Sequence, residues 1–165
     1  MKLRDNSIWD RSTRIPEIYG TLIFLGLLVY FFIAYLFNFV HILELRLLNL
    51  VILITGVYFA LRQYRRTHRG HMDYFRAFTK GMATAAIGTL TFASFLLLYL
   101  HIDQNLMNML AEKQPLGVHL NPYIVSFTVS LEGVFSGLFV SFLLSNYMSS
   151  RVPVPPTRPT GEIIQ

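Results

Sequence analysis

Residues 18–40 read IYGTLIFLGLLVYFFIAYLFNFV, a run of twenty-three residues without a charged side chain. The hydrocarbon core of a bilayer is about 30 Å thick, and a helix needs about 20 apolar residues to cross it. The run is long enough and apolar enough to do so. It therefore predicts a membrane-spanning helix from Ile18 to Val40, and this prediction decides the fold class.

Three further stretches meet the same length requirement: Ile42 to Leu61, Gly81 to Leu100 and Tyr123 to Leu144. The second span carries Glu44 and Arg46 near its start, the third is uncharged, and the fourth holds Glu132. The sequence therefore predicts an all-α fold, an integral membrane four-helix bundle. Its domain comprises residues 18–148, between an N-terminal tail of residues 1–17 and a Pro-rich tail of residues 149–165 that we expect to be disordered.

The composition excludes several other classes of protein. Hydrophobic residues make up 53% of the chain and charged residues 14%, against about 25% charged in an average soluble domain. Disordered chains show the opposite balance, with low hydrophobicity and high charge. The absence of Cys excludes a disulfide scaffold and thiolate chemistry.

The basic residues predict the orientation of the spans. Twelve of the fourteen Lys and Arg residues lie before span one, between spans two and three, or after span four, and only Arg46 and Lys113 lie elsewhere. By the positive-inside rule, both termini are cytoplasmic. We expect these charges to face anionic lipid headgroups rather than nucleic acid, for which no motif is present. We also expect no cleaved signal peptide, because the first apolar run is too long for one.

The connections between the spans contain local structural signals. Val40 to Ile42 predicts a tight hairpin between spans one and two. Tyr74, Phe75 and Phe78 share one face of a predicted cytoplasmic interfacial elbow helix that bends into span three. Residues 103–113 predict a short outer helix between spans three and four, capped by Asp103, with Leu106, Met107 and Leu110 at helical spacing. Asn121 followed by Pro122 predicts the start of span four.

Small residues recur at helical spacing in spans three and four, where they allow two backbones to approach closely. Those selected as helix-packing positions are Gly81, Ala85, Gly88, Ser130, Gly133 and Gly137. They fit either contacts within the monomer or a homodimer seam through Gly133 and Gly137. Span one is large and aromatic throughout, and we expect it to face lipid.

Residues 71–81 read HMDYFRAFTKG and lead from a basic turn into span three. Together with the segment from Tyr99 to Lys113 and the fourth span rich in small residues, this passage resembles the family catalogued as domain of unknown function 4199, found mainly in Bacteroidota. The resemblance covers about residues 18–150, although Gln104 stands where the family has Pro. It implies four helices in a bacterial inner membrane. It implies no activity and no catalytic residue.

Few side chains are arranged for chemistry. His68, His71 and Asp73 form one weak metal-binding candidate, but four neighbouring Arg residues disfavour a dication. Single histidines at three span ends form the other: His41, His101 and His119. The chain contains no phosphate-binding loop, nucleophile elbow or zinc-protease motif. We therefore expect neither a metal nor a cofactor, and no catalytic residues.

Glu132 is the exception, because an acidic side chain inside a span costs about 2.5–3.5 kcal/mol on insertion scales. Three interpretations remain open. Glu132 can form an ion pair with Arg46, it can remain protonated and donate to a hydroxyl group, or it can serve as a proton or ion site. The hydroxyl groups at comparable depth belong to Tyr30, Thr55, Thr89, Thr91 and Ser94.

These features favour a non-enzymatic membrane protein that acts through helix–helix association, as an accessory or scaffold subunit or a small homo-oligomer. The alternative is a small proton- or ion-coupled transporter with Glu132 as its intramembrane carboxylate. A lipid-modifying enzyme rests only on the basic loop and is the weakest of the three hypotheses.

Overall fold

The computed structural model describes residues 14–37, 46–67, 74–113 and 120–149, and all regular structure in these ranges is helical. The helices are α1 (Ile15–Leu36), α2 (Arg46–Thr67), α3 (Tyr74–Ile102), α4 (Gln104–Lys113) and α5 (Pro122–Ser149). Four of them are long and apolar enough to cross a membrane. The all-α fold with four candidate spans is therefore confirmed.

The helix boundaries differ from the predicted spans where polar residues extend a helix or a turn ends it. α3 and α5 begin earlier or end later than their apolar runs because helical hydrogen bonding continues into polar sequence. α1 ends at Leu36 rather than Val40, and the N–H of Phe37 donates to the carbonyl of Ile33 at 3.1 Å. The predicted hairpin at residues 40–42 lies outside the described residues.

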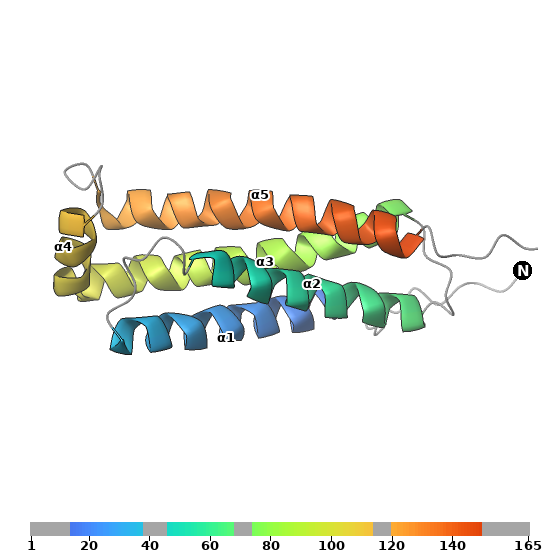
Figure 1. The fold of residues 1–165 in the computed structure, drawn as a ribbon, viewed down its shortest axis with the longest axis horizontal. Coiled ribbons are helices and arrows are strands. Elements are labelled where there is room, and N and C mark those ends of the chain that lie inside the picture. Colours follow the sequence, from blue (N-terminus) through green and yellow to red (C-terminus); the bar gives the residue numbers. More distant parts are fainter. Residues whose placement is uncertain (1–13, 38–45, 68–73, 114–119, 150–165) are drawn as a thin grey trace, which may run out of the picture.

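The long helices run lengthwise beside one another, and α4 lies across one end (Figure 1). α3 is the central helix and contacts all four of the others, most extensively α5 and α1. In its most apolar window 39% of the residues are buried, against 17% for α5. The core is therefore organised around α3, while most of α5 faces outward.

Aromatic rings fill the contact between α1 and α3. The ring of Phe31 on α1 is buried and lies edge-on to Tyr99 at 5.2 Å, to Phe95 at 6.1 Å and to Phe92 at 6.3 Å. One face of α1 is thus buried, which corrects the expectation that the whole of span one faces lipid. Edge-to-face pairs of this kind add to the packing beyond their buried area.

The predicted elbow residues are the first turns of α3, which is one continuous helix of 29 residues rather than a separate elbow followed by a span. The Tyr74 ring is parallel to that of Phe78, with ring centroids 6.4 Å apart. It lies edge-on to Phe142 of α5, with ring centroids 6.3 Å apart. Phe75 is 79% exposed. The Phe75 ring also lies edge-on to Tyr74, with ring centroids 5.7 Å apart, but most of its side chain points outward.

The two predicted helix starts near the α4 end are confirmed. The Leu106 N–H donates to Asp103 Oδ1 at 3.2 Å, and the Ile124 N–H donates to Asn121 Oδ1 at 2.8 Å. The apolar face expected for the short helix is buried, at Leu106, Met107 and Leu110. These caps satisfy N–H groups that have no partner within their own helix.

Candidate functional site

Glu132 lies on the outward face of α5, ten residues after its first residue and hence about 15 Å along the helix. Its side chain is exposed. Large side chains near it on the sides of α5 turned away from α3 are exposed as well: Phe127, Leu131, Phe135 and Phe139. The structure therefore places an acidic side chain on an apolar, outward-facing surface of a candidate span, which we call the α5 outer face.

The structure describes Glu132 but not the side chain of its predicted partner, Arg46. Arg46 is the first residue of α2, which begins part-way along the bundle beside α3 (Figure 1). The side chain of Arg46 and all of Glu44 lie outside the described residues. The ion pair with Arg46 therefore stays a prediction.

Three of the five candidate hydroxyl groups donate within their own helices. Thr55 Oγ1 donates to the Val51 carbonyl and Thr89 Oγ1 to the Ala85 carbonyl, both at 2.8 Å, and Ser94 Oγ donates to the Leu90 carbonyl at 2.9 Å. Because these protons are already engaged, the hydroxyl groups can only accept from a protonated Glu132. Thr89 is also buried against α5.

The small-residue positions lie at helix–helix contacts within the chain. A Cβ added to Gly133 would lie 2.6 Å from Thr89 Cγ2, and one added to Gly137 would overlap the Cβ of Ala85. A Cβ on Gly81 would lie 2.9 Å from Ser141 Oγ. Gly133 and Gly137 thus already face α3, so a second copy of the chain would have to meet α5 on another side.

Gly88 makes the corresponding contact with α1, where a Cβ would lie 2.7 Å from Ile23 Cγ2 and 3.0 Å from the Gly20 carbonyl oxygen. The partner glycine on α1 was missed from sequence. Its signal was present, because Gly20 is one of two glycines in an otherwise bulky span. Ser130, the remaining predicted position, is half-buried and donates to the Ser126 carbonyl at 2.9 Å.

Much of this bundle matches a family of proteins. The family model described as protein of unknown function (DUF4199) matches residues 18–115. The chain belongs to this family. No curated protein and no solved structure matches it. The matched residues of this DUF4199 protein run from α1 to α4, short of the expected extent to residue 150, so Glu132 and the rest of α5 lie outside the match.

At the α4 end, the DUF4199 region ties three helices together through one carboxylate. The Tyr35 hydroxyl of α1 donates to Asp103 Oδ2 at 2.9 Å, while Asp103 Oδ1 caps α4. The Leu106 N–H and then the Tyr35 hydroxyl hold the pKa of Asp103 below its ordinary value of 3.8. A carboxylate that accepts such bonds is stabilised in its charged form.

The metal candidates lie mostly outside the described residues: His41, His68, His71, Asp73 and His119. His101 is described, and its ring lies edge-on to Tyr123 at 5.4 Å. Within the described ranges, no three His, Cys, Asp or Glu side chains cluster so that they could hold a metal ion.

Proposed function

We propose that this DUF4199 protein acts through association in the membrane, with the α5 outer face as the contact surface. It is a non-enzymatic accessory or scaffold subunit, or a small homo-oligomer, of a bacterial inner membrane with both termini in the cytoplasm. The observation that supports this proposal is the exposure of Glu132 within α5, on the least buried of the four spans.

The physical argument concerns what surrounds the carboxyl group. An acidic side chain facing acyl chains costs about 2.5–3.5 kcal/mol. A second helix packed over Glu132 removes its exposed part from lipid and adds to the interaction that Glu132 has within its own chain. The aromatic residues around it, Phe135 and Phe139 among them, supply contact area of the kind that drives helix association in lipid.

Cysteine cross-linking tests this surface cleanly because the sequence contains no Cys. Phe135, 67% exposed and one turn from Glu132, is replaced by Cys, and Val29, 55% exposed on α1, is replaced as the matched control. We expect oxidation in native membranes to give a dimer for Phe135→Cys only. Equal dimer yields, or none for Phe135→Cys, would contradict self-association through the α5 outer face.

The second candidate, a proton- or ion-coupled transporter, uses the same carboxyl group. The exposed position of Glu132 favours the transporter, because a carboxyl group in each copy would line a contact between copies. Replacement by Gln separates the two functions, because an amide can still form hydrogen bonds but cannot release a proton. A homo-oligomer that persists in Glu132→Gln while pH-dependent ion flux is lost would favour the transporter.

A further inference from the structure

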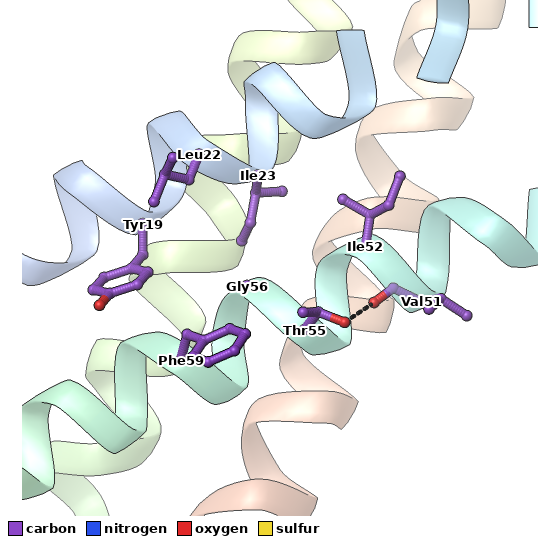
Figure 2. A pocket seen from close by; sticks show the side chains of 8 residues that line it. All are labelled: Tyr19, Leu22, Ile23, Val51, Ile52, Thr55, Gly56 and Phe59. Atoms are coloured by element: carbon purple, nitrogen blue, oxygen red, sulfur yellow. Dashed lines mark hydrogen bonds between the residues drawn. The ribbon is translucent and has the colours of Figure 1, made fainter. Parts of the chain in front are cut away.

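A groove between α1 and α2 lies on a different side of the molecule from the α5 outer face. It has a volume of about 300 Å³. Figure 2 shows Tyr19 and Phe59 at one end and Val51 and Ile52 at the other, with Ile23 and Gly56 between them. Residues 51–59 of α2 give it a length of about 12 Å, close to the roughly 15 Å of one leaflet's hydrocarbon.

The floor of the groove exists because Gly56 has no side chain. A Cβ on Gly56 would overlap the side chain of Ile23, which is buried in the space that this glycine leaves. The walls are apolar side chains that remain partly exposed, such as Leu22 and Phe59. Since Thr55 donates its hydroxyl proton to the Val51 carbonyl, the wall offers little polarity except the Tyr19 hydroxyl.

Two basic residues lie beyond the end of the groove that Tyr19 and Phe59 form. Arg62 and Arg66 follow Phe59 by three and seven residues, so they lie on the same side of α2. Both side chains are exposed. The groove is therefore an apolar surface about as long as one leaflet is deep, with two cations at one end. This arrangement fits an anionic lipid, with its acyl chain in the groove and its phosphate at the cations.

We propose that this groove binds one acyl chain of an anionic phospholipid, with its phosphate headgroup on Arg62 and Arg66. The two arginines at one end argue for a lipid rather than a second helix as the occupant, because a phosphate at headgroup depth can contact both of them. Charge argues against a zwitterionic lipid, because two arginines without a matching carboxylate on their stripe of α2 favour a net negative headgroup.

Photo-labelling tests the site in the full-length protein, reconstituted in nanodiscs. The probes are a phosphatidylglycerol and a phosphatidylcholine with the same chains, each carrying a diazirine in the middle of one acyl chain. We expect the phosphatidylglycerol probe to label peptides containing residues 19–23 and 51–59 well above the phosphatidylcholine probe. Equal labelling of the groove by the two probes would overturn the proposal.

Charge variants isolate the headgroup contact without altering the groove. Near a membrane each arginine contributes about fivefold to the binding of an anionic lipid, so Arg62→Gln with Arg66→Gln should lower groove labelling by phosphatidylglycerol about twenty-fivefold. Labelling by phosphatidylcholine should not change. Arg65→Gln, on another side of α2, is the matched control and should cause a much smaller loss. Arg66→Gln is therefore also measured alone, and a loss for Arg65→Gln equal to that for Arg66→Gln alone would contradict a specific headgroup site.

Filling the groove tests the acyl-chain contact. Thr55→Phe places a ring in the groove, whereas Ile54→Phe places one outside it on the same helix. Thr55→Phe should abolish labelling by both probes, and Ile54→Phe should not. Thr55→Cys tests the other occupant, since a disulfide-linked dimer through residue 55 would show that a second copy fills the groove and would overturn the lipid assignment.

Discussion

α3 and α5 are nearly identical by the criteria that identify a membrane span, yet a larger share of α3 than of α5 is buried. They contain 29 and 28 residues, and their most apolar stretches are equally hydrophobic. In that stretch 39% of the residues are buried in α3 and 17% in α5. Hydropathy therefore explains why both helices are candidate membrane spans, and another property decides which of them becomes the centre of the bundle.

The difference lies in how small residues are distributed around each helix. α3 presents Gly88 to Ile23 of α1, Ala85 to Gly137 of α5, and Gly81 to both Ser141 of α5 and Val57 of α2. α5 has one such side, the one that faces α3, and its other sides carry large exposed residues. Small residues on several sides allow α3 to be approached from several directions, because close packing drives helix association in lipid.

Blocking the α3–α5 contact should have the largest effect. Gly137→Leu adds a side chain where even a Cβ overlaps the Cβ of Ala85, which has no torsion that can move it away. We expect the free energy of unfolding to fall by about 3 kcal/mol, measured by denaturation in mixed micelles. Thr128→Leu, on the exposed side of α5, is the control and should change it by less than about 0.5 kcal/mol. Equal effects would mean that the two sides of α5 do not differ.

Removing a ring from the α1–α3 contact should have an intermediate effect. Phe31→Ala deletes the side chain that meets Phe92, Phe95 and Tyr99. We expect the free energy of unfolding to fall by about 2 kcal/mol. This is less than the roughly 3–5 kcal/mol lost in soluble cores, because the ring can contact lipid in the unfolded state. Phe135→Ala on the α5 outer face is the matched control and should leave monomer stability nearly unchanged in the same denaturation assay.

Changing Glu132 tests the exposed side of the comparison. Glu132→Leu should weaken self-association by about 1 kcal/mol, because it removes a polar contact between helices, and Glu132→Gln should retain most of it. Dimer dissociation in detergent, followed by fluorescence transfer between labelled copies, measures both. If Glu132 is instead paired with Arg46, Glu132→Gln should destabilise the monomer, and adding Arg46→Gln should restore part of the loss.

The sequence predicted those features that depend on neighbouring residues and missed those that depend on a distant helix. The four spans and the caps at Asp103 and Asn121 follow from local composition and spacing. The buried side of α1 depends on Gly20 meeting Gly88, and the groove depends on Gly56 meeting Ile23. A single glycine in a span does not reveal which helix will lie against it, so neither feature could be derived without the packed structure.

Asp103 should give the smallest effect and a defined pH dependence. Its pKa is lowered in the folded chain, so its contribution to stability is present above 3.8, the ordinary value, and is lost as the pH falls through its folded value below 3.8. Asp103→Asn keeps an acceptor for the Leu106 N–H and the Tyr35 hydroxyl but does not titrate in this range. We therefore expect wild type to lose slightly more stability than Asp103→Asn between pH 5 and pH 3, measured by thermal unfolding in detergent. Because the side chain is partly exposed at the end of the bundle, the difference should be small, and a larger loss in Asp103→Asn than in wild type would contradict the assigned direction.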